Sequence, residues 1–275
     1  MLRSLPLAHR VFLERAMPIL RDDVRIVGVA AGGSYASDSM DEHSDLDLVI
    51  AVEPEHVTAV MAKRADIAGA LGPLLGAFTG EHVGEPRLLI CLYGPQALHV
   101  DLKFVELSDV STRVEDPIVL WERDGRVTAA LAQGTARHPQ PDPQWIEDRF
   151  WIWIHYGSSK VARGELFEAM DSLAFLRMVV FGPLMLRSAG ARPQGVRRIE
   201  HAAPALADRL LATVAQYDAH SCLRAFEAAV GLYRELRPAT LQFSAAESAA
   251  VEHLAARQRV RRPRGQPPVR SVAHR

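Results

Sequence analysis

Three aspartates stand at spacings that two neighbouring strands would bring together. Asp45 and Asp47 lie in the segment SDLDLVIAV, and Asp101 lies in the segment LHVDLKFVEL. Because alternate side chains of a strand project from the same face, Asp45 and Asp47 share one face of their strand. If the strand of Asp101 is a neighbour, its carboxylate joins them. Converging carboxylates repel one another unless a cation neutralises them, and magnesium suits them because it prefers oxygen ligands.

A glycine-rich turn precedes these aspartates. Gly32, Gly33 and Ser34 directly follow the apolar run VRIVGVAA, which has the length of a strand. Glycines let the backbone approach a phosphate closely, and free N–H groups in such a turn bind anions. The Ser34 hydroxyl can add a hydrogen bond to a phosphate oxygen. The glycine spacing is not G-x-G-x-x-G, which argues against a dinucleotide-binding turn.

The combined pattern resembles the signature of the DNA polymerase β-like nucleotidyltransferase superfamily over about residues 24–107. Gly33-Ser34 is followed after ten residues by Asp45-Leu46-Asp47, and a third aspartate stands on a later strand. The resemblance implies that Gly33 and Ser34 bind the triphosphate of ATP or another NTP. It implies that Asp45 and Asp47 bind two magnesium ions, and that Asp101 binds the catalytic ion and can serve as general base.

The periodicity of the chain predicts an α+β fold with two domains. Residues 1–133 are predicted to form the nucleotidyltransferase domain, a mixed sheet with flanking helices. Strands are expected at 24–31, 44–52, 87–93 and 98–107, a hairpin or edge strand at 117–127, and helices at 2–20 and 54–75. Residues 134–143 contain three prolines and indicate a linker.

The second half is predicted to be a helical bundle at 141–258, followed by a basic disordered tail at 259–275. Helices are expected near 143–163, 166–189, 203–216, 219–237 and 244–258. This layout is similar to that of aminoglycoside and lincosamide nucleotidyltransferases, and residues 150–173 resemble the first bundle helices of bacterial members.

Composition limits the class of protein. A formal charge of −1 and the lack of a basic stripe outside the tail argue against a nucleic-acid acceptor. Cys91 and Cys222 have no metal-ligand spacing, which fits a reducing cytoplasm. The N-terminal segment carries charges where a signal peptide needs an apolar core. The longest apolar stretch, at 173–186, is interrupted by Arg177 and too short for a bilayer, so we expect no membrane association.

Four further charged residues are candidates for binding. Lys160, on the first bundle helix, is predicted to contact the triphosphate across a cleft. Glu81, Glu85 and Glu168 are predicted to bind the acceptor, with a solvated loop or a salt-bridged helix face as the alternative.

The predicted function is magnesium-dependent transfer of a nucleoside monophosphate, AMP from ATP, to a hydroxyl of a small molecule, with release of pyrophosphate. An aminoglycoside-like antibiotic is one such acceptor, and its modification would give antibiotic resistance. The alternatives are a toxin–antitoxin or signalling enzyme that adenylylates a protein, and a non-catalytic nucleotide-binding module. The sequence leaves open the acceptor, the preferred NTP, the choice of Asp101 or a glutamate as base, and whether the protein is a monomer or a homodimer.

Overall fold

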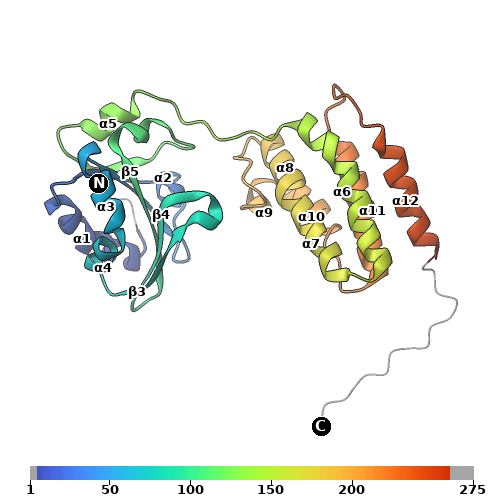
Figure 1. The fold of residues 1–275 in the computed structure, drawn as a ribbon, viewed down its shortest axis with the longest axis horizontal. Coiled ribbons are helices and arrows are strands. Elements are labelled where there is room, and N and C mark those ends of the chain that lie inside the picture. The colour runs from blue at the N-terminus through green and yellow to red at the C-terminus, as the bar shows by residue number, and fades with distance from the viewer. Residues whose placement is uncertain (1–4, 261–275) are drawn as a thin grey trace, which may run out of the picture. The chain divides into compact units, whose positions relative to one another are not determined.

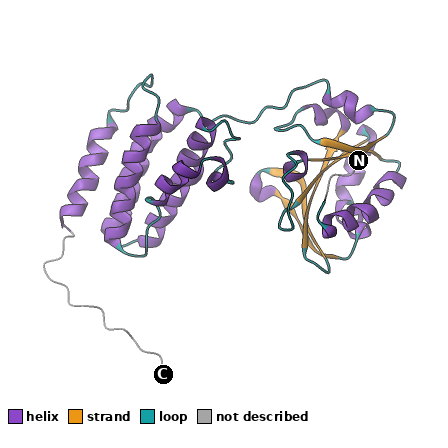
Figure 2. Cartoon of the chain, turned by 180° about the vertical axis from the view of Figure 1, so that it is seen from behind, coloured by secondary structure: helices purple, strands orange, loops and turns teal. Residues whose placement is uncertain are grey.

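The computed structural model describes residues 5–260 and divides the chain into two compact units, Met1–His138 and Pro139–Arg275 (Figure 1). Strands occur in the first unit, and the second is built from helices (Figure 2). This is the α+β class expected from the sequence. Of the predicted tail at 259–275, residues 261–275 lie outside the described residues.

The first unit is built on a six-stranded sheet of order β3-β4-β5-β2-β1-β6. The central pair, β2 and β5, is parallel, and each of the other neighbouring pairs is antiparallel. The sheet is therefore mixed. The strands are β1 (Ile26–Ala31), β2 (Leu46–Val52), β3 (Leu74–Gly80), β4 (Glu85–Tyr93), β5 (Leu98–Glu106) and β6 (Ile118–Glu122).

The two faces of this sheet pack against different elements. On one face, Leu46, Leu48 and Ile50 of β2 are buried in a core formed with α1 (Leu7–Asp22), α3 (Val57–Ala62) and α4 (Arg64–Leu71). The other face has a smaller core, in which Val27, Ala51 and Val105 meet the 3-10 helix η3 (Leu107–Ser111) and α5 (Arg126–Leu131). This second face carries Asp47, and it is only partly covered.

The structure corrects one expectation in this unit and confirms another. The helix expected over 54–75 begins with the 3-10 turn η1 (Pro54–His56) and is divided into α3 and α4 at Lys63. It ends at Leu71 and gives way to β3. Four consecutive positions of β3 are exposed, so its side chains lack the alternation of a half-buried strand. The segment expected as a hairpin or edge strand at 117–127 is the edge strand β6, and the turn after it leads into α5.

The described helices of the second unit share a hydrophobic core. Phe150 and Trp151 of α6 pack there with Tyr233 of α11, and the rings of Phe150 and Tyr233 stack with centroids 3.9 Å apart. Asp142 caps the start of α6 by accepting hydrogen bonds from two backbone N–H groups, and Gly164 ends this helix in a left-handed conformation. The helices are α6 (Pro143–Arg163), α7 (Leu166–Leu176), a π turn (Arg177–Phe181), α8 (Gly182–Ser188), α9 (Ile199–Ala202), α10 (Pro204–Leu211), α11 (Ala219–Leu236) and α12 (Ala246–Val260).

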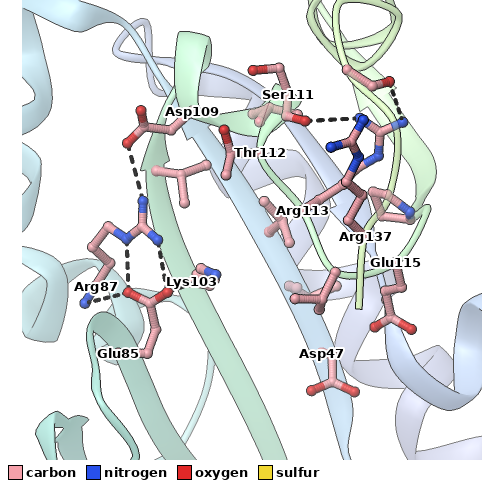
Figure 3. Close-up of a pocket in the computed structure, with 18 of the residues that line it drawn as sticks. Asp47, Glu85, Arg87, Lys103, Asp109, Ser111, Thr112, Arg113, Glu115 and Arg137 are labelled. Atoms are coloured by element: carbon pink, nitrogen blue, oxygen red, sulfur yellow. Dashed lines mark hydrogen bonds and ion pairs between the residues drawn. The ribbon is translucent and has the colours of Figure 1, made fainter. Parts of the chain in front are cut away.

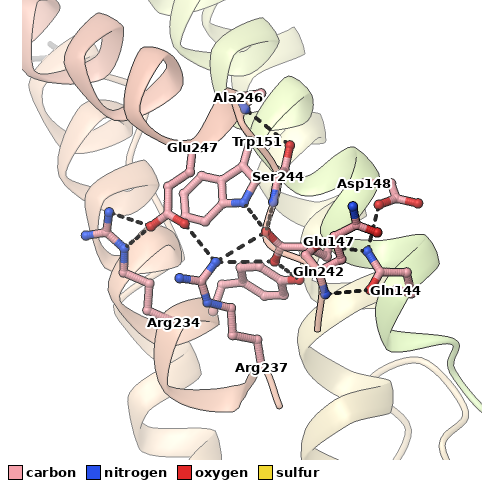
Figure 4. A network of polar contacts seen from close by, with 11 residues as sticks. Gln144, Glu147, Asp148, Trp151, Arg234, Arg237, Gln242, Ser244, Ala246 and Glu247 are labelled. Carbon is pink, nitrogen blue, oxygen red and sulfur yellow. Dashed lines mark hydrogen bonds and ion pairs between the residues drawn. The ribbon is translucent and has the colours of Figure 1, made fainter. Parts of the chain in front are cut away.

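A buried carboxylate joins three parts of this bundle (Figure 4). Glu147 of α6 is fully buried and accepts hydrogen bonds from Trp151 Nε1 at 2.9 Å and Tyr233 Oη at 2.8 Å. The backbone N–H of Ser244 donates to it at 2.9 Å, and Arg237 Nη1 lies 3.3 Å away. Burial acts to raise the pKa of Glu147, but the hydrogen bonds and the Arg237 charge outweigh it, so the pKa is lowered.

The continuous helical stretch Leu166–Ser188 is long and apolar enough, by length and composition alone, to cross a membrane. Its side chains Leu173, Leu176, Phe181 and Met185 are fully buried in the core of the helical unit. The stretch is therefore a core element of this bundle.

Candidate active site

The structure brings the three aspartates together. Asp47 and Asp101 are direct partners in the parallel register of β2 and β5, and Asp45 immediately precedes β2. One carboxylate oxygen from each of the three residues lies within 4.8 Å of those from the other two, and all three residues are half-buried. Such a set of oxygen ligands fits magnesium.

The opposite face of β2 fixes this arrangement. Leu46 and Leu48 are fully buried in the core, so the residues that alternate with them must face the other side. A slip of the strand by one residue would bury the aspartates and expose the leucines. The apolar pattern of β2 therefore sets the direction of the carboxylates.

The glycine turn lies directly against Asp47. The backbone N–H of Gly32 donates to the carbonyl oxygen of Asp47 at 2.9 Å. Gly33 has φ of +55°, and a Cβ built on it would overlap Asp47 Oδ2. Only glycine meets both conditions without strain. Ser34 Oγ is buried and has no hydrogen-bond partner among the described residues.

Glu115 is a site residue that the sequence did not indicate. Its Oε1 accepts a hydrogen bond from the backbone N–H of Gly33 at 2.9 Å, across 82 positions of sequence. Glu115 is in the loop between η3 and β6, in the polar segment STRVEDP. No periodicity or motif marks a single glutamate in such a loop, so only the fold shows its position.

A cavity of about 980 Å³ lies on this face of the sheet, within the first unit (Figure 3). Asp47, Asp101 and Glu115 are among its lining residues, with Gly32 beside them. In the close-up, Glu85, Arg87 and Lys103 form a group of their own, and Arg113 and Arg137 line a third part of the wall. The cavity therefore combines an acidic region with charged walls of both signs.

Glu85 is held in a network of ion pairs in this wall. Its carboxylate accepts from Arg87 Nε at 2.8 Å and lies 2.7 Å from Lys103 Nζ, and Arg87 also contacts Asp109 at 3.1 Å. The Arg87 hydrogen bond, supported by Lys103 and opposed by burial, lowers the pKa of Glu85 to about 2. Two cations thus offset the negative charge of Glu85.

His99 contacts the aspartate cluster, whereas Glu81 does not line the cavity. His99 Nε2 lies 3.0 Å from Asp101 Oδ1, so this histidine borders the third carboxylate. Glu81 is in the short 3-10 helix Glu81–Val83, is exposed, and is not among the residues that line the cavity.

Lys160 and Glu168 belong to the helical unit and contact each other. Lys160 Nζ lies 2.9 Å from Glu165 Oε2 and 3.0 Å from Glu168 Oε1, and its charge lies 4.9 Å from the centre of the Tyr156 ring. The hydrogen bonds to Glu165 and Glu168 raise the pKa of Lys160. Hydrogen bonds from Tyr156 and Lys160 lower the pKa of Glu168.

Comparison with known families finds a match within the first unit. Residues 13–77 match the model of the family described as "Nucleotidyltransferase domain". This range includes the glycine turn, Asp45 and Asp47, and the fold brings Asp101 to them from outside it. The matched segment is similar to a nucleotidyltransferase domain, and it lies within the first unit.

Two solved structures resemble the chain at a low level. An aminoglycoside 6-adenyltransferase from Bacillus subtilis is 12% identical, with a TM-score of 0.38 over 89% of this chain and 97% of that one. A nucleotidyltransferase-like protein from Exiguobacterium sibiricum is 14% identical, with a TM-score of 0.38 over 83% of this chain and 73% of that one. No curated protein sequence matches the chain.

Proposed function

We propose that the protein transfers a nucleoside monophosphate, AMP from ATP, to a hydroxyl group of a small molecule, and that it requires magnesium. The observation that carries this proposal is the cluster of Asp45, Asp47 and Asp101 beside the Gly33-Ser34 turn. A cluster of three carboxylates next to a glycine turn and the unpaired Ser34 hydroxyl suits a metal-bound triphosphate.

The three aspartates are proposed to hold two magnesium ions. Their donor atoms are all carboxylate oxygens, which is the ligand type that magnesium prefers. When bound, the ions would neutralise charge on the phosphoryl oxygens and orient the attacking and leaving oxygens. Asp45 and Asp47 come from one strand end and Asp101 from its parallel neighbour, so the sheet holds the ligands in place before magnesium binds.

The nucleotide is proposed to bind with its triphosphate on Gly33 and Ser34. The unpaired Ser34 hydroxyl can donate to a phosphate oxygen, which would satisfy a buried polar group. Lys160 is proposed as a further triphosphate contact, and it would have to leave Glu165 or Glu168 to make it. In Lys160→Ala, a larger increase in the KM for NTP than in the KM for the acceptor would support this role.

The reaction is an in-line substitution at the α-phosphorus. The acceptor hydroxyl oxygen forms a bond to this phosphorus, the bond to the β-phosphate oxygen breaks, and pyrophosphate leaves with its electron pair. The proton of the hydroxyl is proposed to pass to the carboxylate of Asp101, and the pairing of Asp101 with Asp47 in the register of β2 and β5 supports this role. Positioning and charge stabilisation supply most of the rate enhancement in such reactions.

The acceptor is proposed to be a small hydroxylated molecule, for which an aminoglycoside-like antibiotic is the first class to test. The cavity of about 980 Å³ has the volume of a small-molecule site. Of the candidate acceptor residues, Glu85 lies in its wall. A cationic acceptor would compete with Lys103 and Arg87 for this carboxylate. Glu81 and Glu168 do not line this cavity, and their proposed role in binding the acceptor rests on the sequence alone.

The compartment proposed is the cytoplasm, and the partners proposed are the NTP and the acceptor. Cys91 and Cys222 are both free and buried, as expected in a reducing compartment.

Label transfer tests the proposal. The protein would be incubated with magnesium and each of four NTPs labelled at the α-phosphate, with aminoglycosides, lincosamides, neutral sugars and whole-cell protein as separate acceptors. Magnesium-dependent appearance of label in a small molecule, with ATP preferred, is the expected result. Label in protein would support protein adenylylation, and absence of transfer to every acceptor would contradict the proposed reaction.

A further inference from the structure

We propose that Glu115 is a displaceable carboxylate that occupies the position of a phosphate oxygen at Gly33 and must leave before the nucleotide binds. This inference rests on the proposed function, because it concerns the same nucleotide site. Its consequence is that Glu115 opposes nucleotide binding, whereas a contact residue would favour it.

The contact itself has the chemistry of phosphate binding. Glu115 Oε1 accepts from the Gly33 N–H at 2.9 Å, and a Cβ built on Gly32 would lie 3.0 Å from the same oxygen. The carboxylate therefore lies directly against the turn proposed to bind the triphosphate. Carboxylate and phosphate oxygens are both anionic acceptors that form strong hydrogen bonds with backbone N–H groups.

Glu115 and a phosphate oxygen compete for the backbone N–H of Gly33. The Gly33 N–H is a single donor, and Glu115 takes it in the structure. Glu115 also shares the cavity with Asp47 and Asp101. A triphosphate at Gly33 would bring more negative charge against the Glu115 carboxylate, and like charges at contact distance repel strongly. Departure of the Glu115 side chain removes both conflicts.

The loop around Glu115 is anchored, so we expect the carboxylate to leave by rotation of the side chain and not by movement of the loop. Arg113 donates to the carbonyl oxygens of Leu131 at 2.9 Å and Gly134 at 3.1 Å, and its Nε contacts Asp116 at 2.7 Å. These contacts hold the backbone on both sides of Glu115. A half-buried glutamate at the edge of a cavity changes rotamer without moving its backbone.

The equilibrium between the two Glu115 positions sets the apparent affinity. A site that is open for only a fraction of the time binds with an apparent Kd raised by the inverse of that fraction. If Glu115 leaves Gly33 free for about a tenth of the time, its removal tightens nucleotide binding about tenfold. The same factor applies to pyrophosphate, provided that it binds through the same N–H.

Binding measurements on Glu115→Ala and Glu115→Gln test this inference. Isothermal titration calorimetry would measure the binding of a non-hydrolysable α,β-methylene ATP with magnesium, and of magnesium pyrophosphate, to each variant. Glu115→Ala empties the position, whereas Glu115→Gln keeps the shape and removes the charge. Glu14→Gln, on the exposed surface of α1, is the matched control for loss of one negative charge.

We expect about tenfold tighter binding of both ligands to Glu115→Ala, a smaller gain for Glu115→Gln, and no change for Glu14→Gln. Unchanged or weaker binding in the folded Glu115 variants would overturn the inference and make Glu115 a nucleotide or acceptor contact. If Glu115→Ala does not fold, the glutamine variant alone decides. Failure of every variant and of the unaltered protein to bind the ATP analogue would instead contradict the proposed function.

Discussion

Asp47 and Asp101 are paired across the parallel strands β2 and β5, in the register that also pairs Leu48 with Leu102. The leucines are fully buried on one face of the sheet, and the aspartates stand on the other. The same packing that forms the core therefore brings the two carboxylates to one point. The pairing of β2 with β5 thus brings together two residues that are 54 positions apart in the sequence.

Gly33→Ala is expected to lose nucleotide binding and to destabilise the protein. A non-glycine residue at φ of +55° costs about 1–3 kcal/mol, and the new methyl group would also overlap Asp47 Oδ2. Gly84→Ala is the matched control, because Gly84 has φ of +76° but open space around its Cβ position. Thermal unfolding and calorimetric titration with an ATP analogue would be measured for both. Equal nucleotide affinity in the two variants would show that the Gly33 turn does not hold the triphosphate.

Ser34→Ala is expected to weaken nucleotide binding while leaving stability unchanged or slightly raised. The hydroxyl is buried and unpaired in the protein alone, so its removal breaks no hydrogen bond there. In the complex, a bond to a charged phosphate is worth about 1.5–3 kcal/mol, or about a 10- to 150-fold change in Kd. Equilibrium binding and urea unfolding would measure the two effects. A loss of stability without a loss of affinity would assign Ser34 a purely structural role.

The ion pairs of Glu85 predict a specific dependence of stability on pH. The pKa of this carboxyl is lowered from 4.5 to about 2 in the folded protein, so the folded state favours the charged form. The stabilisation is fully present above the unfolded pKa and is lost as the pH falls from about 4.5 to about 2. The difference in unfolding free energy between the unaltered protein and Glu85→Gln should shrink over this interval. A difference that stays constant with pH would contradict the ion-pair account.

Glu147→Ala is expected to destabilise the helical unit by at least about 2 kcal/mol, because it leaves buried Trp151, Tyr233 and Ser244 donors without their acceptor. Glu147→Gln keeps an acceptor and should cost less. Urea unfolding would be followed by tryptophan fluorescence, since three of the four tryptophans are in this unit. Glu252→Ala, at an exposed position of α12, should change stability by less than about 0.5 kcal/mol. Similar values for Glu147→Ala and Glu252→Ala would contradict the structural role of Glu147.

The sequence predicted the strands whose residues show a clear hydrophobic pattern. The apolar run before Gly32 is β1, and the alternation in SDLDLVIAV gives both the strand β2 and the direction of Asp45 and Asp47. The convergence with Asp101 needed one more assumption, that the two strands are neighbours, and the sheet order meets it.

The sequence could not show contacts that depend on loops or on exposed strands. The strand β3 has four exposed positions in a row and therefore no half-buried pattern to find. Glu115 reaches Gly33 through a loop whose path is set by β6 and Arg113. Glu147 stands among other polar residues of α6, and only the packing of α11 and the following loop shows that it is buried.

The most direct test of the account is the rate of magnesium-dependent label transfer by Asp47→Asn, compared with Asp22→Asn as the control. Asp22 is exposed at the end of α1, so its variant makes the same chemical change outside the site. Circular dichroism would verify that both variants fold. Asp47→Asn is expected to lose about 100- to 1000-fold in rate, because a neutral amide replaces an anionic ligand at the reacting centre. Asp22→Asn is expected to keep the full rate. A near-normal rate in folded Asp47→Asn would contradict the claim that this carboxylate cluster carries nucleotidyl transfer.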